Sequence, residues 1–285
     1  MTLQWRIGKV RVTRIVELEA TGGSRFILPA ATREEVRKIP WLAPHFADDE
    51  GRLRMSVHAL VVETPSRRIL VDTCIGNDKE RTIPTWSHMQ TRFLQDLEAA
   101  GFAPGSIDTV LCTHLHVDHV GWNTRLEAGR WVPTFPTARY LIGRAEFAYW
   151  QAQARAGAGE PAVFQDSVQP VFDAGLVDLV ETDHVVCAEV RLEPTLGHTP
   201  GHVSVRIASD GEEALITGDF LHHPCQMARP EWASSADFDP AAAMATRRRM
   251  FGELAGGQVL VIGTHFAAPT AGRVVADGAR WRLEA

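Results

Sequence analysis

Short apolar runs that end in polar residues recur along the chain. Residues 107–112, 214–216 and 259–262 are short and mostly aliphatic, a pattern typical of buried strands. Residues 9–19 alternate apolar with polar positions, which predicts an early strand, bulged or regular. Residues 57–72 contain two such runs around a proline turn and predict a hairpin.

Four segments have the pattern of helices. Residues 32–39 begin with a cap-like threonine followed three positions later by a glutamate. Residues 88–100 place apolar side chains on one side and stop at Gly101, and residues 144–156 and 240–254 are two further predicted helices. Proline begins the last of these, as is common in a first helical turn. Strands alternate with helices late in the chain, and hairpins dominate early, which together indicate an α/β protein.

Four strong metal-binding side chains fall within six residues, directly after the strand predicted at 107–112. They are His114, His116, Asp118 and His119, in the pattern H-x-H-x-D-H. Imidazole suits zinc and iron, and a carboxylate adds an oxygen ligand. No ordinary packing pattern requires three histidines and an aspartate together. The segment therefore predicts a metal site at the carboxyl end of a strand, where loops of layered α/β proteins form sites.

Other polar residues follow apolar runs in the same way. Asp219 and His265 come after two of the predicted strands, and Asp72 ends the predicted hairpin. His198 lies in a loop whose shape is fixed by glycines and a proline. A single histidine after a strand is more often a hydrogen-bonded structural residue. Taken together and in this order, the four residues predict contributions to the same metal site.

With these motifs the chain resembles the metallo-β-lactamase-fold hydrolases, from about residue 57 to residue 265. The resemblance implies an αββα four-layer sandwich, in which two mixed sheets pack face to face with helices outside, and it implies two metal ions. Asp72 is implied to be a buried carboxylate that hydrogen-bonds the metal loop without binding metal. The implied ligands are His114, His116 and His198 for the first metal, Asp118, His119 and His265 for the second, and Asp219 as the bridge.

This ligand set favours a catalytic site over a non-catalytic zinc module. Two metals about 3.5–4 Å apart can share one hydroxide and lower its pKa toward neutrality, which supplies a nucleophile without serine or cysteine. Zinc is the first choice, because histidine-rich sites with open positions suit it. Iron and manganese are the alternatives, since the order of affinities does not fix the metal used in a cell.

Length and charge are those of an ordinary globular enzyme. The implied ligands span 114–265 and need one continuous structure, so we predict a single domain over 1–285, with 1–55 as an N-terminal extension. The net charge of −6 argues against a nucleic-acid partner. The basic run Arg247-Arg248-Arg249 lies in a predicted helix and is interpreted as a solvent-facing surface.

The pattern of cysteines and the lack of a recognisable targeting signal predict a cytoplasmic location. The cysteines lie far apart with no C-x-x-C pair, which predicts buried free thiols. The N-terminus lacks a charged stretch followed by an apolar core, and no stretch reaches the length of a membrane span. We therefore expect neither a membrane contact nor a secreted antibiotic-resistance β-lactamase.

Several residues are candidates for the substrate pocket. The loop 76–89 contains glycine and proline and should overhang the site. Within it, Trp86 and Met89 either line the pocket or cover the core. Trp122, three residues after His119, and Phe220, next to Asp219, are two further candidates, and together with Trp86 they could form an aromatic pocket.

The segment 145–171 is rich in aromatic residues. In the resembled family, insertions at this place shape substrate entry or form a dimer contact. Both alternatives stay open, and a homodimer is expected only as an implication of the resemblance.

Two substrate classes are the main alternatives. The favoured one is a lactone or ester, as for the quorum-quenching enzymes that open N-acyl homoserine lactones. Such enzymes have a tyrosine three residues after the bridging aspartate, whereas this chain has His222 three residues after Asp219. A histidine there can donate a hydrogen bond or a proton, or it can be structural. The second class is organophosphates or aryl esters, as in the methyl parathion hydrolase branch, which an aromatic pocket would suit.

Two other activities are less favoured. They are a β-lactamase and a glutathione-thioester or persulfide enzyme, and the last needs a basic anchor that the sequence does not reveal. For a small-molecule ester or lactone, we expect the shared hydroxide to attack the carbonyl carbon. The expected catalytic residues are Asp219 as the metal bridge, His222 beside the oxyanion, and Asp118, with solvent as the alternative, as the proton donor to the leaving oxygen.

Overall fold

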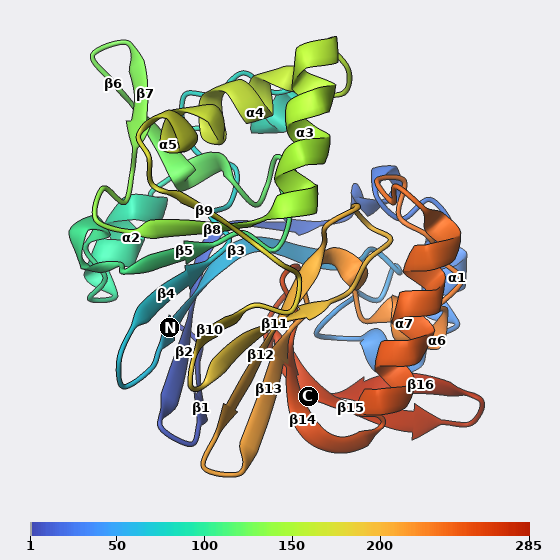
Figure 1. Cartoon of the computed structure of the whole chain (residues 1–285). Helices are drawn as coiled ribbons and strands as arrows, with labels where there is room; N and C mark the ends of the chain where they lie inside the picture. Colours follow the sequence, from blue (N-terminus) through green and yellow to red (C-terminus); the bar gives the residue numbers. More distant parts are fainter. Residues whose placement is uncertain (1) are drawn as a thin grey trace.

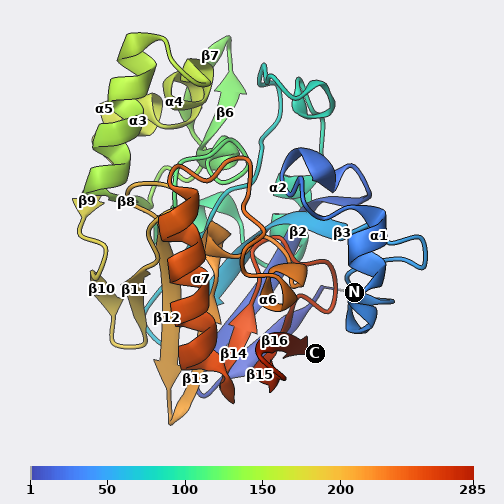
Figure 2. The same ribbon diagram turned by 90° about the vertical axis from the view of Figure 1, so that its right-hand side faces the viewer.

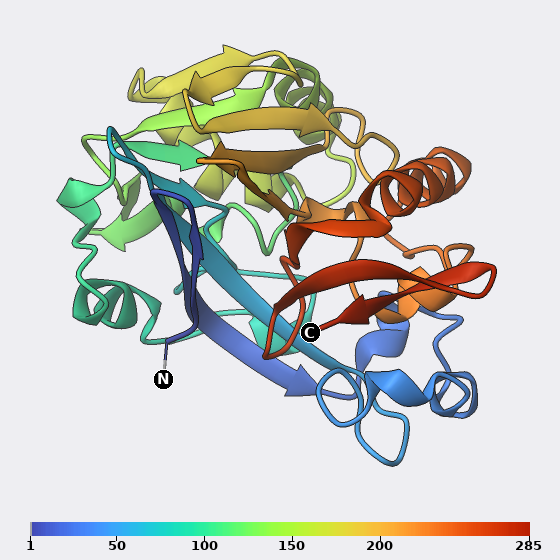
Figure 3. The same ribbon diagram turned by 90° about the horizontal axis from the view of Figure 1, so that it is seen from below.

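Two mixed sheets lie face to face at the centre of the molecule (Figures 1 and 3). The computed structural model describes residues 2–285. The first sheet has the order β1-β2-β3-β4-β5-β8-β9. Its strands are β1 (Gln4–Ile7), β2 (Val10–Thr21), β3 (Arg54–Glu63), β4 (Arg68–Val71), β5 (Thr109–Leu111), β8 (Arg139–Gly143) and β9 (Val177–Val180).

The second sheet has the order β10-β11-β12-β13-β14-β15-β16. The pairs β4/β5, β5/β8, β8/β9 and β13/β14 are parallel, and the other neighbours in both sheets are antiparallel. A separate hairpin of β6 (Thr124–Glu127) and β7 (Arg130–Pro133) projects away from the sheets (Figure 1). The second sheet consists of β10 (Val185–Cys187), β11 (Val190–Pro194), β12 (Val203–Ser209), β13 (Glu212–Ile216), β14 (Gly256–Ile262), β15 (Ala271–Asp277) and β16 (Arg280–Glu284).

Helices cover the outer faces of both sheets (Figures 1 and 2). On the first sheet they are α2 (Phe93–Ala99), α3 (Arg144–Ala156), α4 (Pro161–Ser167) and α5 (Gln169–Asp173), and on the second α1 (Arg33–Arg37), α6 (Cys225–Ala228) and α7 (Pro240–Leu254). Short 3-10 helices are η1 (Ser24–Phe26), η2 (Pro40–Leu42), η3 (Pro84–Trp86), η4 (Pro104–Ser106), η5 (Gly121–Asn123) and η6 (Gly218–Phe220).

Three apolar clusters hold the layers together. One lies between the sheets and includes Leu111 and Ile216. The other two lie between each sheet and its helices, around Phe93 and Phe251. Because both faces of each central strand are covered, these strands are apolar runs rather than alternating ones. The predicted αββα four-layer sandwich is confirmed.

The local predictions in the first 72 residues are also confirmed in their main features. β2 contains a register shift between Val16 and Leu18, which is the optional bulge of the early strand. The side chain of Thr32 accepts a hydrogen bond from the backbone N–H of Glu35 and caps α1. β3 and β4 form the expected hairpin. The residues predicted as an N-terminal extension supply β1 and β2 to the first sheet.

The helix predicted at 88–100 is shorter than expected, since α2 begins at Phe93. His88 has a φ of 52°, outside the helical region, and its N–H donates to the carbonyl of Lys79 at 2.6 Å. The N–H of Thr91 donates to the side chain of Asn77 at 2.7 Å. These contacts with the preceding loop compete with helical hydrogen bonds and delay the start of the helix.

The interpretation of Arg247 as solvent-facing is wrong. Its side chain is fully buried, whereas Arg248 and Arg249 are exposed. The guanidinium donates to the carbonyl of Pro230 at 3.0 Å and pairs with Asp237 at 3.4 Å. A buried carboxylate therefore draws one member of the basic run inward.

All four cysteines are free thiols, as predicted. Cys74, Cys112 and Cys225 are buried, while Cys187 is partly exposed because it ends the edge strand β10. Within residues 2–285, no helix combines the length and the apolar character needed to cross a membrane.

Candidate metal centre

Seven histidine and aspartate side chains converge at one end of the sandwich. The first sheet supplies four of them from the loop after β5, and the second sheet supplies three from the segments after β11, β13 and β14. Strands that end at the same edge bring distant loops together, which is why local runs separated along the sequence form one site. The seven are His114, His116, Asp118, His119, His198, Asp219 and His265.

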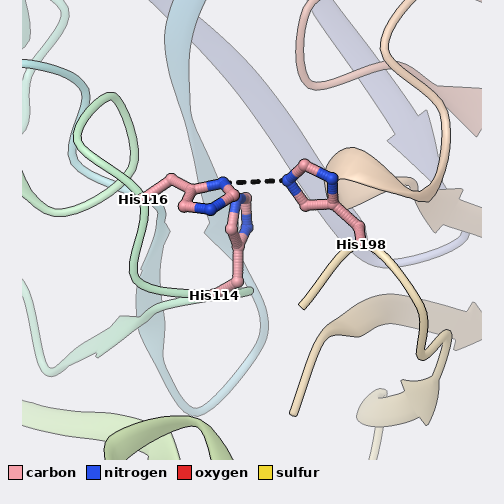
Figure 4. Close-up of side chains that lie close together, drawn as sticks. All are labelled: His114, His116 and His198. Atoms are coloured by element: carbon pink, nitrogen blue, oxygen red, sulfur yellow. Dashed lines mark hydrogen bonds between the residues drawn. The ribbon is translucent and has the colours of Figure 1, made fainter. Parts of the chain in front are cut away.

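The first group comprises the three histidines implied for the first metal. Figure 4 shows the rings of His114, His116 and His198 pointing toward one another from two loops. His116 Nδ1 lies 3.1 Å from His114 Nε2 and 2.9 Å from His198 Nε2. Burial lowers the pKa of His114 and His198 well below the ordinary value, and that of His116 to about 4. All three imidazoles are therefore neutral near pH 7, which is the form that binds metal.

The second group joins Asp118 and His119 from the first sheet to His265 from the second. His265 Nε2 lies 3.2 Å from His119 Nε2 and 3.6 Å from Asp118 Oδ2. Asp118 is partly exposed toward the cavity above the site, whereas the two histidines are buried.

Asp219 stands between the two groups. Its Oδ2 lies 3.3 Å from His119 Nε2 and 3.7 Å from His198 Nε2, and its Oδ1 lies 3.2 Å from His265 Nε2. Burial alone would raise the pKa of this carboxyl, but His265 and His119 hold it well below its usual range. The Asp219 carboxylate therefore lies within 3.7 Å of a histidine nitrogen of each group.

The donor set fits two metal ions. A neutral ring nitrogen has either one N–H or one lone pair, so His116 Nδ1 can form a full hydrogen bond with only one of the two nitrogens that face it. Two ligands of a tetrahedral zinc ion lie about 3.3 Å apart when each Zn–N bond is about 2.0–2.1 Å long, close to the spacings found here. Asp219 Oδ1 is buried without a hydrogen-bond partner. The clusters thus support a dinuclear metal site.

Asp72 lies beneath the metal loop and is fully buried. Its Oδ1 accepts the N–H of Thr113 at 2.8 Å, and its Oδ2 lies 2.9 Å from His119 Nδ1. A proton on Nδ1 leaves His119 Nε2 free for a metal, as outer carboxylates commonly arrange. Asp72 therefore contacts the metal loop at a backbone N–H and at the ring nitrogen of His119 that faces away from His265.

His202 orients the proposed bridge and was not predicted as a site residue. Its Nε2 accepts the backbone N–H of Asp219 at 2.7 Å, and its Nδ1 donates to the carbonyl of Thr195 at 3.0 Å. Gly218, with a φ of 56°, lies so close that a Cβ there would sit 2.6 Å from His202 Nε2. The feature of the sequence that could have indicated His202 is its position four residues after His198, in the same loop.

Asp237 holds His198 from outside the metal group. Its Oδ1 lies 3.0 Å from His198 Nδ1, and its Oδ2 accepts the N–H of Ser234 and faces Arg247. Burial raises the pKa of Asp237, and the pairing with Arg247 opposes that rise. No sequence pattern pointed to this carboxylate, because it lies in an irregular segment before α7.

A cavity of about 900 Å³ opens above the metal groups. His116, Asp118, His198, Asp219 and His265 lie at its floor. Its walls come from β2 and β3, the segment 22–27, η3 and the helices α3 and α4. The apolar wall residues are Leu18, Ala20, Phe26, Ile27, Met55, Val57, Ile83, Trp86, Leu115, Val117, Trp150, Val163 and Phe164.

Only one of the four predicted pocket residues lines this cavity. Trp86 does so and contacts Phe26 edge to face, with ring centroids 6.2 Å apart. Met89 packs against the core behind it and is not among the lining residues of the described chain. Of the two positions considered, pocket wall and core cover, Trp86 takes the first and Met89 the second.

Trp122 and Phe220 correct the prediction of an aromatic wall next to the ligands. Trp122 is buried in the core, stacked on Phe93, and its indole N–H donates to Glu17 at 2.6 Å. Phe220 is buried against Phe251 of α7. Both side chains belong to the apolar clusters between the sheets and the helices, and neither is among the residues that line the cavity.

His222 does line the cavity. Its ring is buried, and its Nε2 lies 3.2 Å from Asp219 Oδ2. Neither ring nitrogen has a hydrogen-bond partner among residues 2–285. Together with His198 and Asp219, it forms a fourth group of potential ligands.

The chain belongs to the metallo-beta-lactamase superfamily, whose sequence profile matches residues 52–271. The fold, the ligand set and this match define a hydrolase of that superfamily. An N-acyl homoserine lactonase of Bacillus thuringiensis is 22% identical over 211 residues, covering 70% of this chain and 76% of the relative.

Two solved structures are similar over almost the whole chain. AidC, a dizinc quorum-quenching lactonase in complex with a product, has a TM-score of 0.79 at 21% identity, covering 99% of this chain and 96% of AidC. The hydrolase AbOPH of the beta lactamase superfamily has a TM-score of 0.79 at 25% identity, with the same coverages of 99% and 96%. These likenesses show the fold and leave the substrate open.

Proposed function

We propose that this protein is a dinuclear-metal-dependent hydrolase that opens a lactone, with N-acyl homoserine lactone-like substrates favoured. The observation that carries the proposal is the position of the two metal groups, at the floor of a cavity of about 900 Å³ with apolar walls. Such a cavity suits a small polar head at the metals with an apolar chain along the walls. The lactonase relatives support the same substrate class.

The charge of the cavity supports a neutral substrate. Among the lining side chains of residues 2–285 there is neither a lysine nor an arginine, while Asp118, Glu160 and Asp219 are acidic. Carboxylate-bearing substrates are usually held by cationic side chains. A β-lactam or glutathione conjugate would therefore find no such anchor, whereas a lactone needs none.

The proposed roles follow from the contacts. Two zinc ions, when bound, would supply a nucleophile derived from water at neutral pH and would polarise the carbonyl oxygen. Within residues 2–285 the ring nitrogens of His222 have no hydrogen-bond partner, and we assign His222 as a hydrogen-bond donor to the developing oxyanion. Asp118 is open to the cavity, and we assign it to take a proton from the attacking water and return it to the departing alkoxide.

Aryl esters and phosphotriesters are the second candidate substrate class. The observation that favours them is the set of aromatic side chains on the cavity wall, Phe26, Trp86, Trp150 and Phe164. Trp86 is one of the aromatic residues expected in the pocket, while Phe26, Trp150 and Phe164 stand in place of Trp122 and Phe220. Planar aromatic leaving groups stack on such rings.

Proton release during hydrolysis separates the two candidates. Protein stripped by a chelator and reloaded with zinc would be given a medium-chain N-acyl homoserine lactone, an aryl ester and a phosphotriester in parallel. We expect kcat/KM at or above about 10⁴ M⁻¹s⁻¹ for the lactone, and loss of turnover in the stripped protein. Turnover confined to the phosphotriester or aryl ester would reject the lactone in favour of the second candidate.

A further inference from the structure

Glu146 connects three parts of the site without being a metal ligand. It lies in the first turn of α3, and its side chain is buried. Its Oε1 accepts the backbone N–H of Leu115 at 3.1 Å and the indole N–H of Trp150 at 2.6 Å. Its Oε2 accepts the backbone N–H of Gly201 at 2.9 Å.

The two backbone donors belong to the loops that carry the first group. Leu115 stands between His114 and His116, and Gly201 follows His198 by three positions. One loop continues from the first sheet and the other from the second. A single carboxylate thus fixes the separation of the two loops whose histidines form the first group.

The packing around this carboxylate is close. A Cβ on Gly201 would lie 2.5 Å from the backbone nitrogen of Glu146, so only glycine lets the loop approach α3. Trp150, the third donor, lines the cavity and sets its ring edge against His116, with centroids 5.3 Å apart. The same carboxylate therefore also orients a wall of the cavity over a proposed ligand.

Glu146 is a buried carboxylate that hydrogen bonds alone stabilise. Asp166 and Asp237 face arginines, whereas no lysine or arginine of the described chain forms an ion pair with Glu146. Burial accordingly raises the pKa of Glu146. Removing a carboxylate from water is costly unless hydrogen bonds replace its hydration, and here these come from the two metal loops and the cavity wall.

We propose that Glu146 is a positioning residue, which holds the His114–His116 loop against the His198 loop and thereby sets the affinity of the first metal. The inference rests on the proposed two-metal site. Residues that orient ligands from outside change metal affinity by about 10–100-fold when replaced. The expected effect of altering Glu146 is a selective loss at one of the two sites.

Zinc titration against a chromophoric chelator tests this without any substrate. In Glu146→Gln, one oxygen can still serve Leu115 and Trp150, but the amide NH₂ faces the N–H of Gly201. We expect one zinc to bind about 10–100-fold more weakly, and kcat to fall more than KM changes. The cobalt-substituted variant should show an altered absorption spectrum.

Glu17→Gln is the matched control. Glu17 also accepts two backbone N–H groups, from Ile75 and Gly76, and the indole N–H of Trp122, but its partners carry none of the seven metal candidates. We expect this variant to bind both zinc ions as the unaltered protein does. If it weakened zinc as much as Glu146→Gln, the effect would be general destabilisation and the proposal would fail.

Gly201→Ala provides a second route if Glu146→Gln does not fold. The added methyl pushes the His198 loop away from α3 while Glu146 stays intact, so the same selective loss is expected. Two zinc ions held with unchanged affinity in either folded variant would overturn the proposal. An unaltered protein that binds two zinc ions but opens no lactone refutes the substrate proposal alone, whereas one that binds fewer than two contradicts both.

Discussion

The floor and the rim of the cavity are built in different ways. At the floor, each proposed ligand follows a strand, and hydrogen bonds from buried groups such as Asp72 and His202 hold the ligands in place. The strands on either side are fixed by the cores between and outside the sheets. The floor is therefore rigid because the whole sandwich supports it.

The rim, by which we mean the walls formed by the loop 76–89 and α4, is held together by contacts between side chains. Arg81 from the loop 76–89 makes two hydrogen bonds to Asp166 of α4, at 2.7 and 2.9 Å. Lys79 adds contacts to Asp166 at 3.3 Å and to Thr124 at 2.8 Å. Burial lowers the pKa of Lys79 to about 8. A small charged network, rather than a sheet, thus holds two walls of the cavity together.

This difference suggests that the floor determines the reaction, while the rim determines which substrates bind. Changes at the floor should affect metal content and kcat, because they alter the reacting groups. Changes at the rim should affect KM and the preference among substrates, because they alter the walls. Each of the following substitutions tests whether that division holds.

Asp219→Ala should have the largest effect. Without the carboxylate between the two groups, we expect metal content to fall below two ions per chain and kcat/KM to fall by more than about 10³-fold. Metal analysis together with proton-release kinetics would measure both. Glu212→Ala, an exposed change on β13, the strand that precedes Asp219, is the control. Retention of both metals and full activity in Asp219→Ala would refute its role as a bridge.

His222→Phe should reduce kcat by about 10²-fold, the usual cost of losing one oxyanion donor, while both metals stay bound. His223→Gln is a suitable comparison, since His223 contacts backbone groups of Phe46 and Cys225 and should influence stability alone. Unchanged kcat and KM in His222→Phe would show a structural role. A lost metal would show that His222 is a ligand.

Asp166→Asn should break the rim without touching the floor. Removing one partner of a buried ion pair costs about 3–5 kcal/mol of stability, so urea unfolding should shift strongly. We also expect KM to rise while metal content and kcat stay the same. Asp173→Asn on the exposed face of α5 provides the comparison. A fall in metal content would contradict the separation of rim from floor.

Trp86→Ala should have the smallest effect, seen only with long substrates. Loss of an apolar wall contact is expected to raise KM for a decanoyl lactone by about 10-fold and to leave a butanoyl lactone unaffected. Met89→Ala, in the same loop but outside the cavity, should change neither value. Equal changes for both chain lengths would place the acyl group elsewhere.

The floor could be predicted from sequence because its signals are local. His114, Asp219 and His265 each follow an apolar run, so the end of a strand and a ligand are visible in one short segment. The arrangement of the two sheets then follows from the resemblance to the metallo-β-lactamase fold. The main layers and the seven candidate ligands were accessible for this reason.

The partners of those ligands could not be predicted in the same way. Glu146 meets Gly201 across 55 positions, and Asp237 meets His198 across 39. Neither stands in a recognisable motif, because such contacts depend on how the layers pack. Arg247 shows the same limit, since its basic run indicates solvent while tertiary contacts bury one member.

Each metal group takes its candidate ligands from both sheets, so metal binding should affect the stability of the protein as well as its activity. An ion bound there acts as a cross-link between halves of the chain that are far apart in sequence. A free metal concentration 1,000 times the dissociation constant would add about 4 kcal/mol to the free energy of unfolding. Metal supply would then govern how long each molecule survives proteolysis as well as whether it can react.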